Sequence, residues 1–131
     1  MAVTFEETTR EFLDRKNFAV LTTLDRQGSP QSSVIWYKLE GDSILFTTLD
    51  GRQKARNLQR DPRVSLLVLD KDDAYRTIEI RGNVEIRPDP ERLLSKELTR
   101  SYLGQDPPKD PDGQSRLIVR IVPEKVIPFS V

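Results

Sequence analysis

The 131-residue chain contains no histidine and no cysteine. Without them it cannot build a Ser-His-Asp or Cys-His catalytic group, a thiolate redox pair, a disulfide framework or a structural zinc site with the usual ligands. Its acidic residues do not follow the loop spacing of a calcium or magnesium site, so we expect no metal. Carboxylates, hydroxyls, amines and an imported cofactor remain as sources of reactivity.

Long apolar runs and a net charge are also missing. No segment approaches the roughly 18 apolar residues of a membrane-spanning helix, and residues 1–14 lack the basic and apolar regions of a signal peptide. The 21 basic and 21 acidic side chains cancel, which argues against a general nucleic-acid-binding or polybasic membrane protein. We therefore expect one cytoplasmic domain over residues 1–131, with neither nucleic acid nor a membrane as partner.

Apolar runs separated by turn-forming residues predict six short antiparallel strands. The expected strands are residues 18–24, 31–39, 43–48, 63–69, 75–87 and 116–122. Most connections are too short for a parallel crossover, and closing the sheet into a barrel removes its exposed edges. Gly82 interrupts the alternation of the fifth strand, which indicates a bulge or bend. The fold class is therefore mainly β, a closed or partly closed six-stranded antiparallel barrel.

Short helices are expected at the connections between strands. Thr4 and Glu7 have capping-box spacing, which predicts a helix over residues 4–15. Two further helices are expected within residues 51–60 and from Asp89, as cap, to Gly104, as stop.

Positive charge is concentrated where the second helix begins. Residues 51–63 hold five basic side chains and one acidic one, although the whole chain is neutral. The segment follows Thr47 and Thr48, so hydroxyls, free backbone N–H groups and the helix dipole converge with Arg52 and Lys54. Such an arrangement holds an anion such as a phosphate. A solvated basic helix face explains the same charges equally well, and the residues alone leave both readings open.

The motifs around this segment resemble a known family. They are Phe-Thr-Thr at 46–48, Gly-Arg-Gln-Lys-Ala at 51–55, Asp-Pro-Arg-Val-Ser-Leu-Leu at 61–67 and Ile-Arg-Gly-Asn-Val-Glu at 80–85. Their order and spacing are similar to those of the pyridoxamine 5′-phosphate oxidase-like superfamily of flavin and deazaflavin binders, over residues 4–128. The resemblance implies an FMN-binding split barrel that forms a homodimer, with the cofactor in a groove at the interface.

The resemblance also implies which residues hold the cofactor. The second strand would line the ring, the segment from the third strand to the second helix would grip the phosphate, and a polar position on the long strand would touch the cofactor. Carried over by position, the binding residues are Gln31, Ser32, Ser33, Val34, Trp36, Thr47, Thr48, Arg52, Lys54, Asn57 and Thr77.

Three departures bear on the choice of cofactor. Gln31-Ser32-Ser33 replaces the arginine usual on the second strand, the helix entry reads Gly51-Arg52-Gln53-Lys54 instead of Gly-Ser-Arg-Lys, and the tail at 121–131 lacks the usual Arg and His. The compact layout resembles reductases that depend on the deazaflavin coenzyme F420. The phosphate and anionic glutamyl tail of F420 suit the basic track of Arg52, Lys54, Arg56 and Arg60.

The expected function is hydride transfer from reduced F420 to a small conjugated acceptor such as an enone or quinone, with FMN as the alternative cofactor. Such a cofactor carries the hydride itself, which accounts for the missing histidine and cysteine. No catalytic residue is singled out; Tyr37, Lys38 and bound water are the candidates for a proton donor. Trp36, Tyr37, Tyr75 and Phe129 would form an aromatic wall beside the ring, or else pack in the core or in a dimer interface.

Two other functions stay open. The chain would serve equally as a carrier that binds a flavin or deazaflavin without turnover, because nothing in it marks a catalytic acid or base. A small barrel that binds single-stranded nucleic acid is the third hypothesis, but residues 51–63 contain no aromatic residue to stack on bases.

Overall fold

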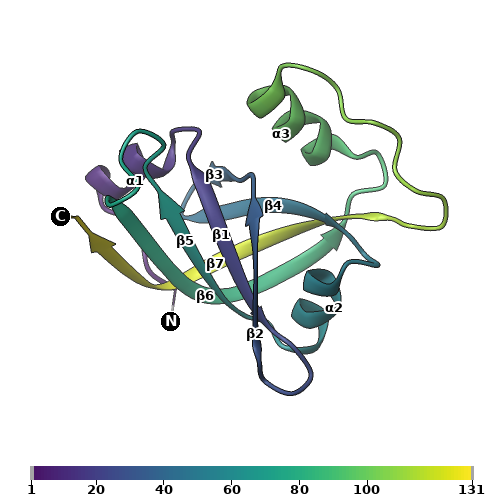
Figure 1. The fold of residues 1–131 in the computed structure, drawn as a ribbon, viewed down its shortest axis with the longest axis horizontal. Coiled ribbons are helices and arrows are strands. Elements are labelled where there is room, and N and C mark those ends of the chain that lie inside the picture. Colours follow the sequence, from purple (N-terminus) through teal and green to yellow (C-terminus); the bar gives the residue numbers. More distant parts are fainter. Residues whose placement is uncertain (1, 131) are drawn as a thin grey trace.

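The computed structural model describes residues 2–130, which form one antiparallel sheet and three helices (Figure 1). The strands are β1 Phe18–Leu24, β2 Pro30–Ile35, β3 Lys38–Glu40, β4 Ser43–Leu49, β5 Arg63–Leu69, β6 Thr77–Pro88 and β7 Arg116–Phe129. The helices are α1 Glu7–Leu13, α2 Gln53–Arg60 and α3 Leu93–Leu103. The prediction of a mainly β antiparallel fold with short helices is confirmed, but the sheet has seven strands and not six.

The extra strand comes from the segment expected to be one strand over residues 31–39. Trp36 and Tyr37 interrupt it, and the two halves become β2 and β3, at opposite edges of the sheet order β2-β1-β5-β6-β7-β4-β3. Both interrupting side chains are anchored elsewhere: the Tyr37 hydroxyl donates to the Leu13 carbonyl at 2.8 Å, and Trp36 stacks on Tyr102. These tertiary contacts have no counterpart in the local pattern, which continues to alternate.

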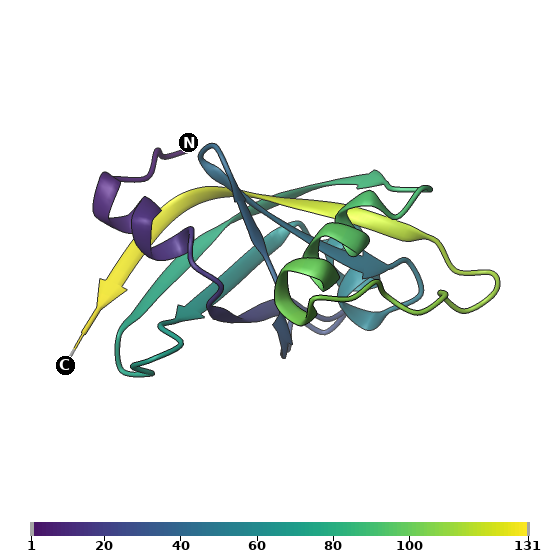
Figure 2. The ribbon, with the colours of Figure 1, turned by 90° about the horizontal axis from the view of Figure 1, so that it is seen from above.

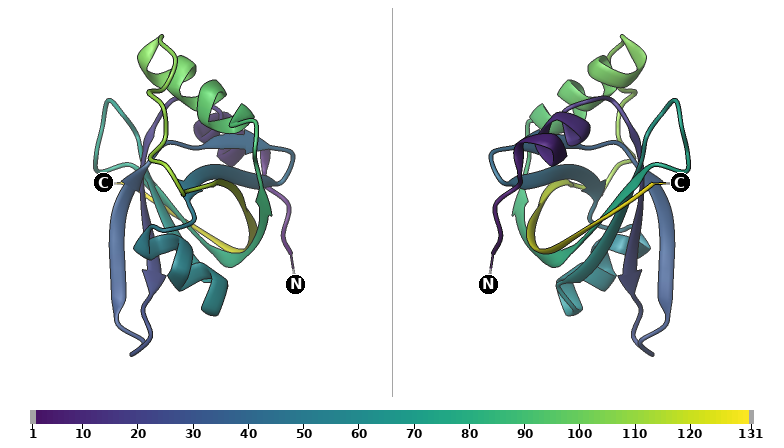
Figure 3. Two further views of the ribbon diagram at one scale, coloured as in Figure 1. Left: turned by 90° about the vertical axis from the view of Figure 1, so that its right-hand side faces the viewer. Right: turned by 90° about the vertical axis from the view of Figure 1, so that its left-hand side faces the viewer.

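The two-residue link between β2 and β3 shows that the sheet is rolled up. In a flat sheet of seven strands the two edges would lie about 29 Å apart, whereas the step from Ile35 to Lys38 spans at most about 11 Å. The sheet therefore curls until its edges meet, and the curled strands appear as a ring in Figure 3. Among the described residues β2 and β3 share no hydrogen-bonded ladder, so the barrel is split along this seam.

The two longest strands bend sharply around Gly82. The register between β6 and β7 shifts between Arg81 and Gly82, and a Cβ atom on Gly82 would lie 2.1 Å from the Val122 carbonyl oxygen. The predicted bulge is therefore confirmed, and only glycine permits this close approach of two backbones. The last strand runs to Phe129, well past the expected end at 122, because it stays paired with β6 as far as Thr77.

Alternate strand residues fill the barrel, with Ile44, Phe46, Leu66, Ile80 and Ile121 fully buried in its core. Figure 2 shows α1 and both termini at one end of the molecule and α3 at the other. α1 contributes its buried residues to the main core, and α2 packs against the barrel wall. α3 stands apart from the barrel and is joined to it by a smaller apolar cluster (Figure 1).

The N-termini of α1 and α3 test two predicted helix caps. α1 begins at Glu7 and no described side chain caps it, so the predicted capping box of Thr4 and Glu7 is wrong. The backbone N–H of Phe5 instead donates to Asp42, which fixes the approach to the helix. The predicted cap at Asp89 is confirmed in another form: its carboxylate accepts from the backbone N–H groups of Leu93 and Leu94, both at 3.0 Å.

Candidate functional site

A groove of about 460 Å³ lies between the barrel and α3, and we call it the α3 groove. Its barrel side brings together the end of β2, the middle of β4 and the first turn of α2. Its other walls are one face of α3 and the loop that follows. The lining residues used below are Val34, Trp36, Thr47, Lys54, Ser95, Leu98, Thr99, Leu103 and Arg116.

Lys54 carries the positive charge of this groove. Its side chain is half-buried, and it forms no ion pair or hydrogen bond with any of residues 2–130. Burial lowers the pKa of the Lys54 ammonium group, and the neighbouring charge of Arg52 lowers it further. A partly desolvated cation without a partner is destabilising on its own, so an anion entering the groove would gain both a partner and a hydrogen-bond donor.

The other basic residue of the groove is already neutralised. Arg116 donates to both carboxylate oxygens of Asp110, at 2.9 and 3.0 Å. Arg116 holds the carboxyl pKa of Asp110 below its usual range. Lys54 is therefore the free cation among the residues that line the groove.

An aromatic pair forms a flat wall beside the groove. The rings of Trp36 and Tyr102 stack with their centroids 5.3 Å apart and their planes inclined by 14°. The Tyr102 hydroxyl donates to the Asn17 carbonyl at 2.9 Å, which fixes the ring. Of the four aromatic residues proposed for a cofactor wall, Trp36 lines the α3 groove; Tyr37 is buried elsewhere, and Tyr75 and Phe129 are exposed outside it.

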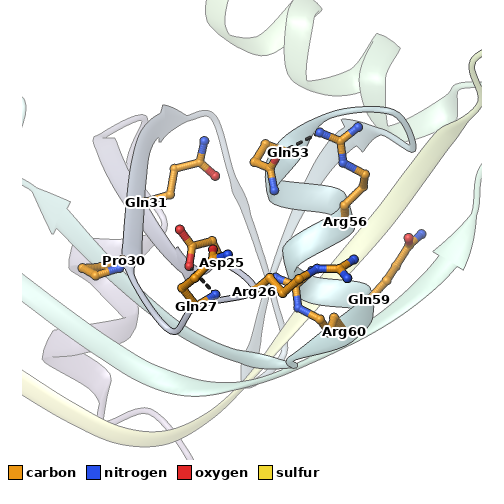
Figure 4. A pocket seen from close by; sticks show the side chains of 9 residues that line it. All are labelled: Asp25, Arg26, Gln27, Pro30, Gln31, Gln53, Arg56, Gln59 and Arg60. Atoms are coloured by element: carbon orange, nitrogen blue, oxygen red, sulfur yellow. Dashed lines mark hydrogen bonds between the residues drawn. The ribbon is translucent and has the colours of Figure 1, made fainter.

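A second hollow, of about 900 Å³, lies between the β1–β2 turn and the outer side of α2, and we call it the hairpin hollow. Figure 4 shows Gln31 on the β2 side, Gln53, Arg56 and Arg60 on the α2 side, and Arg26 in the turn. The one carboxylate lining it, on Asp25, accepts from the backbone N–H groups of Gln27 and Ser29 within the turn. Three arginines therefore make this hollow strongly positive. Because Gln53 lines it and Lys54 lines the α3 groove, the two sites flank the first turn of α2.

Asn57 ties α2 to the two strands beneath it. Its fully buried amide donates to Thr23 and Gln31, both at 3.0 Å, and accepts from Gln53 at 2.7 Å. Arg60 approaches the same amide oxygen at 3.3 Å. Both amide hydrogens are thus used within the protein, and Asn57 positions the glutamines on either side of the hairpin hollow.

The model of the pyridoxamine 5′-phosphate oxidase family matches residues 5–129. The chain belongs to this family. An F420 reductase of known structure is 32% identical, with a TM-score of 0.82 over 94% of this chain and 98% of that one. A conserved hypothetical protein of Mycobacterium tuberculosis is 29% identical, with a TM-score of 0.76 over 98% and 86%. General Stress Protein 26 of Bacillus anthracis, at 21% identity, shares the fold with a TM-score of 0.68 over 92% and 89%.

The split barrel of the pyridoxamine 5′-phosphate oxidase family brings some of the predicted binding residues together. Val34, Trp36, Thr47 and Lys54 line the α3 groove, while Gln31 lines the hairpin hollow beside it. Their roles as cofactor ligands stay predictions.

The remaining predicted binding residues lie outside both cavities. Arg52 is exposed just before α2, and Thr48 is buried. Ser32 shares a hydrogen bond of 2.8 Å with Thr22 on the outside of the sheet, and Ser33 pairs with Leu21 of β1. Thr77 lies beside α1, at the far end of the molecule, so within one chain it cannot reach the ligand of the α3 groove.

Sequence reasoning missed the α3 side of the site. Ser95, Leu98, Thr99 and Leu103 recur at helical spacing and line the groove. The apolar period predicted a helix here, but it did not indicate which face would meet the barrel. The available signal was the pair of hydroxyls, Ser95 and Thr99, one turn apart among leucines.

The two candidate side-chain proton donors lie away from the groove. The buried Tyr37 hydroxyl donates to Leu13, and burial raises its pKa. The Lys38 ammonium group pairs with Glu97 at 2.8 Å. Among residues 2–130 no cluster of three or more acidic side chains is placed to bind a metal ion. None of the three described helices is long and apolar enough to cross a membrane.

Proposed function

We propose that the protein is an oxidoreductase that binds the deazaflavin coenzyme F420 and transfers hydride from its reduced form to a small conjugated acceptor. The observation that carries the proposal is Lys54, a half-buried lysine without an ion-pair partner in the described part of the chain. It lies in the first turn of α2 and lines a groove that has an aromatic wall. Membership of the pyridoxamine 5′-phosphate oxidase family and the 32% identity to an F420 reductase support a flavin or deazaflavin cofactor.

The residues of the site fit the parts of such a cofactor. The Lys54 ammonium group and the first N–H groups of α2, which no described side chain caps, suit a phosphate. The Trp36–Tyr102 wall suits a planar ring. The arginines of the hairpin hollow, Arg26, Arg56 and Arg60, suit the carboxylates of a glutamyl tail. FMN shares the ring and the phosphate but lacks the tail, so it is the second candidate.

When bound, a reduced deazaflavin supplies a hydride, which adds to the conjugated carbon of an enone while a proton completes the product. The chain has only to hold the ring and the acceptor at reacting distance and to keep water out of the groove. No histidine or cysteine is needed for these tasks. Turnover distinguishes this function from that of a carrier, which would bind the cofactor tightly and reduce no acceptor.

The first prediction concerns cofactor affinity. We expect the protein to bind F420 more tightly than FMN in fluorescence titrations, because only F420 engages the three arginines of the hairpin hollow. Lys54→Ala should weaken F420 binding about tenfold, the expected effect of losing one charge-assisted hydrogen bond to phosphate. Its free energy of unfolding should stay within about 0.5 kcal/mol of the wild-type value, because Lys54 forms no ion pair or hydrogen bond within the described fold.

Lys71→Ala is the matched control, because Lys71 is an exposed lysine in the β5–β6 turn, outside both cavities. Equal F420 affinity in Lys54→Ala and Lys71→Ala would contradict the site. No binding of either cofactor would contradict the function itself. Tight binding without oxidation of reduced F420 by any enone or quinone would favour the carrier.

We also propose that two copies pair through the outer face of the sheet. Opposed residues of neighbouring strands share a face, and the registers align Phe18, Leu69, Thr77 and Phe129 in one outer row. The next row includes Val34, Val20 and Leu67, and Phe18 and Val34 are 54% and 64% exposed. In such a homodimer Thr77 would serve the site of the partner chain, because it lies on this same face.

A further inference from the structure

Ser95 carries an unused hydrogen-bonding group into the α3 groove. The residue is only 3% exposed and lies in the first turn of α3. Its hydroxyl forms no hydrogen bond with any of residues 2–130, although its backbone carbonyl accepts from the Thr99 hydroxyl at 2.7 Å. A hydroxyl that keeps a free donor on the wall of a groove can take part in recognition of a ligand. Because Ser95 lines the groove, its hydroxyl is free to bond to water or to a ligand that displaces the water.

The neighbouring groups determine what kind of partner that is. Thr47 and Thr99 already donate their hydroxyl hydrogens, to the Leu117 and Ser95 carbonyls. Arg116 is committed to Asp110. Among residues 2–130 no carboxylate lines the groove, and the polar groups left free are the Ser95 hydroxyl, the Lys54 ammonium group and the exposed Gln105 amide. The Ser95 hydroxyl hydrogen is uncommitted within the described chain, so it can be donated to an acceptor oxygen of a ligand.

The walls near Ser95 restrict the rest of the ligand. Leu98 and Leu103 lie on the same face of α3, and Trp36, which packs against the cluster that contains Leu98, lines the same groove. These surfaces suit a flat, apolar body. An acceptor oxygen on a flat, apolar body describes a conjugated carbonyl compound such as a quinone or an enone.

We propose that the Ser95 hydroxyl binds the carbonyl oxygen of the hydride acceptor and selects conjugated carbonyl compounds over apolar molecules of the same shape. The identification of this ligand as the hydride acceptor rests on the proposed function. The placement follows from the groove: Lys54 and the first turn of α2 form the anion-binding side, and α3 forms the opposite wall, against which a second molecule would pack. Hydride arriving at the conjugated carbon moves electrons onto the carbonyl oxygen, so the same hydrogen bond would strengthen during reduction.

The chain offers a direct probe of this groove. Trp36 is its only tryptophan, so intrinsic fluorescence reports occupancy of the groove without any cofactor. Menadione is a suitable ligand, with 2-methylnaphthalene as the hydrocarbon of the same shape without carbonyl groups. The quinone cannot react with a thiol, because the chain has no cysteine.

We expect Ser95→Ala to weaken menadione binding about five- to tenfold, the usual effect of losing one hydrogen bond from a buried site. The affinity for 2-methylnaphthalene should not change, and this difference between the two ligands is one that altered packing alone would not produce. Ser101→Ala removes a hydroxyl from the same helix outside the groove and should change neither affinity.

Equal menadione affinity in Ser95→Ala and the wild type, or no menadione binding by the wild type, would overturn the inference. A loss of F420 affinity in Ser95→Ala would also overturn it, because Ser95 would then hold the cofactor and not the acceptor. These outcomes are separate from the fate of the proposed function, which depends on F420 or FMN binding by the wild-type protein.

Discussion

Asn57 illustrates how a residue with a predicted binding role can have a more evident structural one. Its side chain is completely buried and joins Thr23 of β1, Gln31 of β2 and Gln53 of α2 in one network. Asparagine is a weak helix former, so its presence within α2 is explained by these contacts and not by propensity. The network orients both glutamines toward the hairpin hollow.

Replacing Asn57 should therefore cost stability as well as binding. We expect Asn57→Ala to lower the free energy of unfolding by about 2–3 kcal/mol, because it leaves the buried Thr23 hydroxyl and the Gln31 amide without their partner. Urea unfolding measures the change. Gln59→Ala, an exposed position on the same helix, should stay within about 0.5 kcal/mol of the wild type. A similar value for Asn57→Ala would mean that the network contributes little.

The sequence predicted half of the candidate site. Lys54 and Thr47 were found because charge clustering and a strand-to-helix transition are local patterns. Ser95 was not found, because the pair of hydroxyls at Ser95 and Thr99 does not indicate which face of the helix meets the barrel. Its significance comes from a free hydroxyl on the groove wall, and that position depends on how α3 meets the barrel. Trp36 was predicted beside the ring, but its stacking partner Tyr102, 66 positions away, was not.

At the scale of elements, α3 depends on the loop that follows it. Few residues join α3 to the barrel, and the loop from Gly104 to Ser115 returns along the groove to β7. Asp110 ties this loop to the start of α3 and to the start of β7. It accepts two hydrogen bonds from Arg116 of β7. Its Oδ2 also lies 3.0 Å from Nε of Arg92, just before α3, in an ion pair without hydrogen-bond geometry. One carboxylate thus holds the loop wall of the α3 groove.

We expect Asp110→Asn to loosen this wall without unfolding the barrel. At pH 7 amide hydrogen exchange within residues 104–115 should become about tenfold faster, because two arginines lose their counter-ion. Asp112→Asn is the control, since that exposed carboxylate approaches only Lys109. Unchanged exchange in Asp110→Asn would show that packing, and not the ion pairs, holds the loop.

The same carboxylate predicts a pH dependence. Arg116 holds the pKa of Asp110 below its usual range, so the folded state favours the ionised form. Its stabilising contribution is therefore complete above the ordinary carboxyl pKa of about 3.9 and is lost as pH falls through the lower, folded value. The wild type should resemble Asp110→Asn only in that acidic range.

Element prediction succeeded where the pattern is local and failed where tertiary contacts decide. The strands at 18–24 and 63–69, the stop at Gly104 and the bulge at Gly82 all follow from residue types. The break at Trp36 and Tyr37 does not, because both residues suit a strand. Their anchoring to α3 and α1 overrides that preference and sends the chain from one sheet edge to the other.

At the scale of the whole molecule, rolling the sheet leaves two different surfaces outside. One is polar and basic around α2, and the other is the half-apolar outer face of β1, β2 and β5. Apolar side chains exposed side by side on one face are a common feature of interfaces. Thr77 lies at the far end of its own chain, so it can bind a cofactor only in the site of a second chain. A second copy on this face would bring Thr77 of one chain toward the site of the other.

This leads to a prediction about assembly. Leu67→Arg should shift the protein from dimer to monomer in sedimentation velocity, because it replaces an apolar side chain at the centre of the proposed interface by a long charged one that must be desolvated on pairing. The monomer should stay folded, since Leu67 is only partly buried on the outer face of the sheet and lies opposite the acidic Glu79. Leu93→Arg is the matched control, an exposed leucine on α3 away from this face. If Leu67→Arg stays dimeric, the interface lies elsewhere; if the wild type is already monomeric yet binds F420 fully, Thr77 has no part in the site.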